Sequence, residues 1–446
     1  AIEKINAAQP KLNAVVTMID EEANTNAGKL AGVPVALKDN ISTRGVRTTA
    51  SSRILDNYVP VYDATIVEKL RAAGADFVCK ASMDELGMGG TNKNAYTGVV
   101  HNPYDLDRIP GGSSGGCAAL VADGCVPLAI GTDTGDSIRK PAAYCGVVGV
   151  KPTYGRISRY GIIPYASSLD HVGYFTTNVQ DAALALEVLA GRDDHDMTSS
   201  YEPVGEYEKL LNSDLTNKTI GVFKTVMDEV KNEELKVQFN ALVSKLEAKG
   251  AKIVEVEMPK EYMELIAPVY KTIANAEATA NHSNLDGIRF GMREDGSDLE
   301  EIMTNTRTKG FSSYVRARFV IGSYSLFEEN QDRLFRKAQK IRRLIVQAYA
   351  KMFEKCDAVL CVAAPTIAPL INESSNVRFG VSSFAEEHMQ LQNFSGYPSI
   401  TLPLGKVDSM PVAVNLTCKP FEEQKMFDVS SAIEECTGLK GQCLEG

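Results

Sequence analysis

The sequence lacks the residue patterns that hold metal ions or build a disulfide framework. Its nine cysteines are scattered, with no C-x-x-C pair and an odd total, and its five histidines all lie far apart along the chain. This pattern fits reduced thiols in a reducing compartment and does not fit a zinc site. We therefore expect no metal, and a location in the cytoplasm or, in a eukaryote, in the mitochondrial matrix.

The chain also lacks a long apolar run and an excess of positive charge. No stretch approaches the roughly 18 apolar residues that cross a bilayer, and the start does not resemble a signal peptide. Because the chain begins at Ala1, already inside a helical pattern, we expect that an N-terminal piece has been trimmed. The net charge of −10 disfavours a large direct contact with nucleic acid, whose phosphates require clustered Lys and Arg. The basic segment from Lys337 to Arg343 is more typical of a solvated helix face.

Apolar segments with the periods of strands and helices alternate along the chain, which predicts an α/β protein with a mixed sheet flanked on both faces by helices. We expect one domain over residues 1–446, in which a polar loop at about 191–217 joins a core at 31–190 to the remaining strands and helices at 218–446. Expected strands are 33–37, 76–79, 126–130, 147–150, 219–223, 252–256, 358–362, 399–404 and 411–416. Expected helices are 64–73, one near Met83, 179–190, 233–249, 259–281 and 324–356.

The stretch from Gly131 to Pro141 is the first candidate for chemistry. A buried strand stops at a glycine, Gly/Asp/Thr-rich turns lead to Ser137, and Pro141 is expected to interrupt regular structure. A strand that breaks to display a serine beside free backbone N–H groups suits acyl transfer, because the oxyanion must meet donors already in place. A polar loop with a buried serine explains this stretch equally well.

The second candidate is the Gly-rich segment from Pro110 to Gly116. It contains G-x-S-x-G in two frames, which is compatible with a nucleophile elbow at Ser113 or Ser114. However, an elbow needs a preceding strand, and residues 101–110 are rich in turn formers. A phosphate cradle lacks its G-x-x-x-x-G-K-[ST] motif, so a flexible loop is the favoured interpretation of this segment alone.

The combination of Lys38 at a strand end with Ser113 and Ser137 favours the catalytic interpretation over the loop interpretation of these segments. At these residues the chain resembles the amidase signature family, and the resemblance extends from about residue 31 to 189. The motifs that carry it are Val33–Asn40, Gly111–Gly116 and Gly149–Arg156. The resemblance implies the family's fold, with residues 31–190 as the signature core, and a Ser–Ser–Lys triad.

The family's roles transfer to single positions. The resemblance implies that Ser137 is the acyl-forming nucleophile, Ser113 the bridging serine of a cis peptide, and Lys38 the base. A lysine acts as a base near neutral pH only when its pKa is lowered, and burial beside Val35 and Leu37 would lower it.

The oxyanion hole is expected to consist of the backbone N–H groups of Thr134, Gly135, Asp136 and Ser137. Asp136 departs from the family's usual glycine; its side chain restricts the backbone and brings negative charge toward the oxyanion. Neighbouring Asp133 and Arg139 are expected to form a structural ion pair.

Within the family, the stretches Gly146–Gly161, Ala166–His171 and Lys337–Arg343 are most similar to glutamine-hydrolysing subunits of tRNA-dependent amidotransferases. The resemblance implies that ammonia released from glutamine passes to a partner, which converts Glu-tRNA(Gln) to Gln-tRNA(Gln). The implied partners are subunits B and C or their equivalents, which contact the tRNA and use ATP and Mg; no cofactor is implied for this chain. The alternatives are a stand-alone amidase for other small amides and a catalytically weak scaffold protein.

Two residues are expected to bind the substrate. By the resemblance, Arg318 holds the substrate carboxylate through a bidentate contact, with Arg316 close enough to be an alternative. Glu386 is expected to meet the amino group, and Glu387 is nearly as good a match. A surface glutamate in a loop is an equally suitable interpretation of Glu386.

Overall fold

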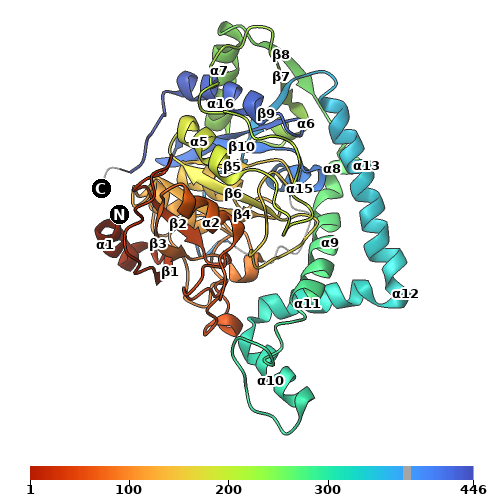
Figure 1. The fold of residues 1–446 in the computed structure, drawn as a ribbon. Helices are drawn as coiled ribbons and strands as arrows, with labels where there is room; N and C mark the ends of the chain where they lie inside the picture. The colour runs from red at the N-terminus through yellow and green to blue at the C-terminus, as the bar shows by residue number, and fades with distance from the viewer. Residues whose placement is uncertain (375–382, 445–446) are drawn as a thin grey trace.

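The computed structural model describes residues 1–374 and 383–444, and one mixed β-sheet of eleven strands runs through the molecule (Figure 1). The strands are β1 Val15–Met18, β2 Pro34–Lys38, β3 Asp76–Ala81, β4 Leu128–Asp133, β5 Val148–Lys151, β6 His171–Thr176, β7 Thr219–Phe223, β8 Lys252–Val256, β9 Ala358–Val362, β10 Ser399–Val407 and β11 Met410–Cys418. They lie in the order β1-β3-β2-β4-β6-β5-β10-β11-β9-β7-β8.

Helices precede, separate and follow these strands along the chain. They are α1 Ile2–Leu12, α2 Thr65–Ala72, α3 Gly115–Ala122, α4 Arg139–Cys145, α5 Val179–Leu189, α6 Lys224–Met227, α7 Glu233–Ala248, α8 Lys260–Glu264, α9 Ile266–Asn281, α10 Leu299–Gly310, α11 Ser313–Leu326, α12 Glu328–Gln331, α13 Lys337–Met352, α14 Phe384–Glu387, α15 Gln390–Ser395 and α16 Glu423–Thr437. Within the described residues, no helix is long and apolar enough to span a membrane.

Strands from the first and last parts of the chain lie side by side in the same sheet. Strand β2 runs parallel to β3 and β4, and β7 runs parallel to β8 and β9. Between these groups the pairing is antiparallel, and Ser399 of β10 lies opposite Lys151 of β5. This pairing brings residues near position 400 next to the segment that contains Ser137.

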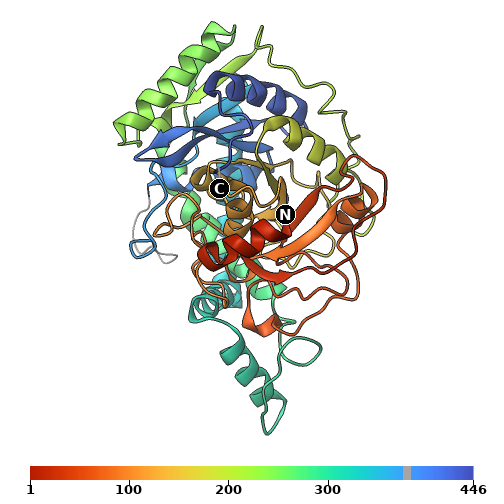
Figure 2. The ribbon, with the colours of Figure 1, turned by 90° about the vertical axis from the view of Figure 1, so that its left-hand side faces the viewer.

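Helices cover both faces of the sheet, as side-chain alternation along buried strands requires. In β2, Val35 and Leu37 enter the core formed with α2, α5, α7 and α16, whereas Ala36 faces the core formed with α1, α3 and α4. Figure 2 shows α5, α7 and α16 along the upper side of the molecule. The predicted fold class is therefore confirmed.

The expected long helices divide into shorter ones. The helix predicted over 324–356 is wrong, because α11 ends at Leu326 and Phe327 takes an extended conformation with φ −57° and ψ 143°. The helix resumes as α12, a π-helical turn at Asp332–Arg336, and α13. The helix predicted over 259–281 is likewise two helices, α8 and α9. Near Met83 there is only a short 3₁₀ turn, Glu85–Gly87.

Three expectations around the serines also change. The Gly-rich segment leads directly into α3, so it begins a helix and is not a free loop. Strand β4 continues to Asp133, two residues beyond Gly131, where it was expected to stop. Pro141 lies inside α4 and does not interrupt it, because proline is tolerated in the first turn of a helix, where the N–H has no intrahelical partner.

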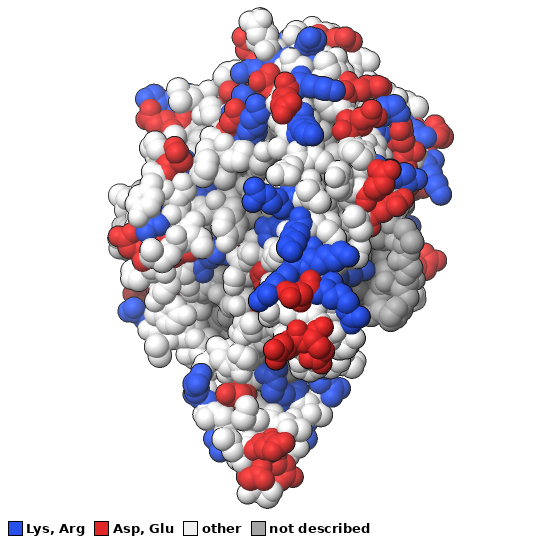
Figure 3. All heavy atoms as spheres, turned by 90° about the vertical axis from the view of Figure 1, so that its right-hand side faces the viewer, with Lys and Arg blue, Asp and Glu red and all other residues white. Residues whose placement is uncertain are grey.

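The basic segment lies on the outer side of α13, as its pattern indicates. Lys337, Lys340 and Arg343 are exposed, whereas Ala338 and Ile345 on the same helix are buried. Figure 3 shows Lys and Arg side chains gathered across this side of the molecule.

Candidate active site

Lys38 is the last residue of β2, and its side chain is fully buried. Its Nζ donates to Ser113 Oγ at 2.9 Å, to Thr132 Oγ1 at 2.9 Å and to the Thr132 carbonyl at 3.3 Å. Because Thr132 belongs to β4, the neighbouring parallel strand, the sheet register fixes the ammonium group beside Ser113.

Burial lowers the pKa of Lys38 to about 8, because the charged form loses its hydration. Cys117, Asp84 and Asp133 act in the opposite direction and limit the shift. An appreciable fraction of Lys38 is therefore neutral just above pH 7, which is the form that can accept a proton.

Asp84 supports the segment that carries Ser113. One carboxylate oxygen accepts from the N–H groups of Asn92 at 2.9 Å and Thr91 at 3.2 Å, and the Asp84 N–H donates to the Ser113 carbonyl at 3.1 Å. The Gly112–Ser113 peptide bond is cis. A Cβ on Gly112 would lie 2.0 Å from the Asp84 carboxylate, so only glycine fits at this position.

Ser137 lies in the turn between β4 and α4 and is 4% exposed. Its carbonyl accepts from the Ser114 N–H at 3.2 Å, which ties the turn to the segment that contains Ser113. In the part of the chain that the structure describes, the backbone N–H groups of residues 134–137 donate to no other group, and none of these residues has a positive φ. The backbone thus accepts a side chain at Asp136, and N–H groups remain available to bind an oxyanion.

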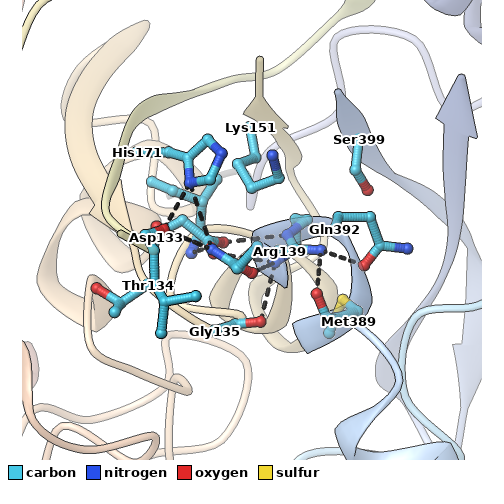
Figure 4. A network of polar contacts seen from close by, with 12 residues as sticks. Asp133, Thr134, Gly135, Arg139, Lys151, His171, Met389, Gln392 and Ser399 are labelled. Carbon is cyan, nitrogen blue, oxygen red and sulfur yellow. Dashed lines mark hydrogen bonds and ion pairs between the residues drawn. The ribbon is translucent and has the colours of Figure 1, made fainter. Parts of the chain in front are cut away.

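A buried network, drawn in Figure 4, holds this turn in place. Arg139 and Asp133 form an ion pair at 2.9 Å with both side chains fully buried, which confirms the predicted structural pair. The guanidinium group also donates to the Gly135 carbonyl at 2.9 Å, to Gln392 Oε1 at 2.8 Å and to Asn393 Oδ1 at 2.7 Å. Neighbouring positive charge and hydrogen bonds outweigh burial and hold the pKa of Asp133 far below its usual range.

A cavity of about 140 Å³ opens beside the turn. Its lining includes Asp136, Lys140, Tyr270, Arg318, Glu386 and Glu387, whereas Ser137 itself is not part of the lining. Access to the nucleophile from this cavity therefore passes the side of the turn that carries Asp136.

Arg318 reaches the cavity from α11. Its guanidinium group donates to Tyr165 Oη at 2.7 Å and to Asn275 Oδ1 at 3.2 Å, and it also contacts Tyr314 Oη. Its buried Nε has no hydrogen-bond partner in the described structure. Arg316 is exposed and does not line the cavity. Of the two arginines considered, only Arg318 is placed to bind an anion there.

Glu386 also reaches the cavity, but it is paired with another residue of the protein. Lys140 Nζ lies 3.3 Å from Glu386 Oε2 and donates to the Glu386 carbonyl at 3.0 Å. Burial lowers the pKa of Lys140, but Glu386, Tyr144, Asp136 and Glu387 together outweigh this effect and raise the pKa above its usual value, so the lysine stays protonated. Glu386 is therefore a half-buried partner of Lys140 on α4, unlike a surface glutamate in a loop.

Asp136 presents a different electrostatic environment. Burial raises its pKa to about 7, the nearby charges of Asp133 and Glu387 act in the same direction, and Lys140 opposes them. Its carboxylate makes no hydrogen bond or ion pair with residues 1–374 or 383–444.

Sequence reasoning missed several residues of the site. Thr132 was overlooked although it precedes the Asp133–Ser137 turn on the strand beside Lys38. The Asp84 carboxylate accepts from residues seven and eight positions away, and Lys140 pairs with Glu386, 246 positions away; no local pattern indicates either residue. The tyrosines around Arg318, Tyr165 and Tyr314, also follow no motif.

Comparison with known proteins agrees with this geometry. The Amidase family model matches residues 1–427, and the chain belongs to this family of amide-hydrolysing enzymes. The A subunit of glutamyl-tRNA(Gln) amidotransferase from Carboxydothermus hydrogenoformans is 42% identical, covering 98% of this chain and 92% of the relative. The same protein from Sulfurihydrogenibium sp. is 40% identical, with coverages of 96% and 91%.

Solved structures give the same picture. The crystal structure of the A subunit of glutamyl-tRNA(Gln) amidotransferase from Thermotoga maritima superposes with a TM-score of 0.82 at 35% identity, covering 97% of this chain and 89% of that one. The peptide amidase from Stenotrophomonas maltophilia has the same TM-score at 26% identity, covering 98% and 92%.

Proposed function

We propose that this chain is the glutamine-hydrolysing subunit of a tRNA-dependent amidotransferase and that it works through Lys38, Ser113 and Ser137. The observation that supports the chemistry best is the buried contact of 2.9 Å between Lys38 Nζ and Ser113 Oγ. The match to glutamyl-tRNA(Gln) amidotransferases over nearly the whole chain supports the choice of substrate.

In the proposed mechanism, neutral Lys38 accepts a proton from Ser113, which accepts one from Ser137 as Ser137 Oγ attacks the amide carbon. The N–H groups of residues 134–137 stabilise the oxyanion, and each well-placed donor contributes roughly 3–4 kcal/mol. When the C–N bond breaks, the proton returns through Ser113 to the leaving nitrogen and ammonia departs. Water then hydrolyses the acyl-enzyme by the same relay.

The cavity suits an amino-acid amide. Arg318 would hold the carboxylate, because its fork of donors matches a carboxylate and its Nε has no other partner. The ammonia would then pass to partner subunits B and C or their equivalents, which would contact the tRNA and bring ATP and Mg. No cofactor is assigned to this chain.

A glutaminase assay tests the proposal. Wild-type chain, alone and with its partner subunits, should release ammonia from glutamine, and Ser137→Ala should release none. A fluorophosphonate probe should label wild type but not Ser137→Ala. Equal labelling of the two proteins would remove Ser137 as the nucleophile. Hydrolysis of simple amides without any hydrolysis of glutamine would instead indicate a stand-alone amidase, and the absence of both labelling and hydrolysis would indicate a scaffold protein.

A further inference from the structure

The cavity beside the turn holds three carboxylates, but they are not equivalent. Asp136, Glu386 and Glu387 all line it. The Glu386 carboxylate is held by Lys140, a buried lysine on α4, at 3.3 Å. Glu387 accepts a hydrogen bond from Gln390. A carboxylate already paired with a buried cation has less negative charge to offer a ligand, so Glu386 is a poor acceptor for a substrate ammonium group.

Asp136 has no such partner among the described residues. The backbone N–H of Lys140 donates to the Asp136 carbonyl at 2.8 Å, so the turn fixes the main chain and leaves the side chain at the cavity wall. An unpaired carboxylate in a partly desolvated site is unfavourable unless a cation or a proton joins it. A bound ammonium group would provide that cation.

We infer that Asp136 is the residue that binds the α-ammonium group of the amino-acid amide, in place of Glu386. This inference rests on the proposed glutaminase function and deepens it. Arg318 binds the negative end of the substrate, and Asp136 binds the positive end. Asp136 and Ser137 are adjacent residues, so the proposed ammonium site lies on the same turn as the nucleophile.

The arrangement also accounts for a negative side chain beside an oxyanion hole. Lys140 compensates part of the Asp136 charge, and a bound ammonium group compensates more of it, so the developing oxyanion faces less negative charge when substrate is bound. An amide without an amino group leaves that charge in place. Asp136 therefore acts as a specificity-determining residue that favours amino-acid amides over simple amides.

The test compares glutamine with glutaramate, which is glutamine without its α-amino group. Dissociation constants are measured at pH 8 by calorimetry in a Ser137→Ala background, where neither amide is turned over. Steady-state constants are measured in the otherwise wild-type chain. Asp136→Asn should weaken glutamine binding about 10- to 100-fold, the usual effect of losing a charge-assisted hydrogen bond, and should not weaken glutaramate binding.

Two further variants make the comparison decisive. Asp136→Glu, which restores the charge, should recover a preference for glutamine, and Glu386→Gln should retain it. If Asp136→Asn is poorly folded by circular dichroism, Asp136→Ser replaces it. The inference is overturned if Asp136→Asn keeps the preference for glutamine, or if Glu386→Gln removes it. Failure of the proposed function is a separate result, in which wild type hydrolyses no glutamine and the Ser137→Ala chain binds none.

Discussion

Replacing Asp136 by Asn should accelerate hydrolysis of glutaramate, and the gain should grow with pH. An ionised carboxylate roughly 6 Å from the oxyanion, at an effective dielectric constant of about 20, costs about 3 kcal/mol, or roughly 100-fold in rate. The pKa of Asp136 is about 7, so the group is mostly protonated at pH 6 and mostly ionised at pH 8.

Protonation offers a less costly route at pH 8. At pH 8 about a tenth of the Asp136 side chains are protonated, and protonating the others costs only about 1.4 kcal/mol. This cost is less than the Coulombic penalty, so the wild-type enzyme reacts mainly through the molecules in which Asp136 is protonated. We therefore expect Asp136→Asn to raise kcat/KM for glutaramate about tenfold at pH 8 and hardly at all at pH 6.

The assay is ammonia release measured from pH 5.5 to 9, with Glu387→Gln as a control that removes another carboxylate of the cavity, one that is not adjacent to Ser137 in the sequence. The control should show no pH-dependent gain. An equal gain at pH 6 and pH 8 would refute the argument, because it would show a steric effect of the side chain. No gain at either pH would show that the carboxylate lies too far from the oxyanion to matter.

Three further predictions concern the remaining site residues. Lys38→Ala should abolish glutamine turnover while circular dichroism shows an intact fold, and activity of this variant at pH 7 would contradict a lysine base. In the wild-type protein, kcat/KM should rise with pH up to about 8 as Lys38 loses its proton. Arg318→Lys should raise KM for glutamine about 10-fold or more with a smaller change in kcat, since a single ammonium cannot replace the bidentate fork; an unchanged KM would remove Arg318 from substrate binding. Asp133→Asn should lower the free energy of unfolding in urea by about 3–5 kcal/mol, because Arg139 is left buried without its counter-charge, and a loss below 1 kcal/mol would show that solvent reaches the pair.

Local patterns predicted much of the architecture. The strands around Lys38, at 219–223 and at 252–256 could be recognised because short apolar runs between turn residues have few other interpretations. The break after Leu326 could not be predicted, because no proline marks it, and α11 and α13 each pack against α9 in the folded protein.

The candidate site likewise has residues that the sequence could predict and residues that it could not. Lys38, Ser113 and Ser137 lie in compact motifs, so the sequence could propose them together, and their catalytic roles stay predictions. The pairing of Glu386 with Lys140 joins residues 246 positions apart, so it emerges only from the fold. The sequence match therefore selected Glu386 as the residue that binds the ammonium group, and it did not show that the Glu386 carboxylate is paired with Lys140.

The clamp around Arg139 has a consequence for how the protein is made. Arg139 and Asn393 are 254 positions apart, and Asn393 also donates to the Asp133 side chain at 2.9 Å. A ribosome that has synthesised Ser137 must still translate more than half of the chain before the groups that hold its turn exist. Nascent chains consequently carry the serine long before they carry the groups that hold its turn.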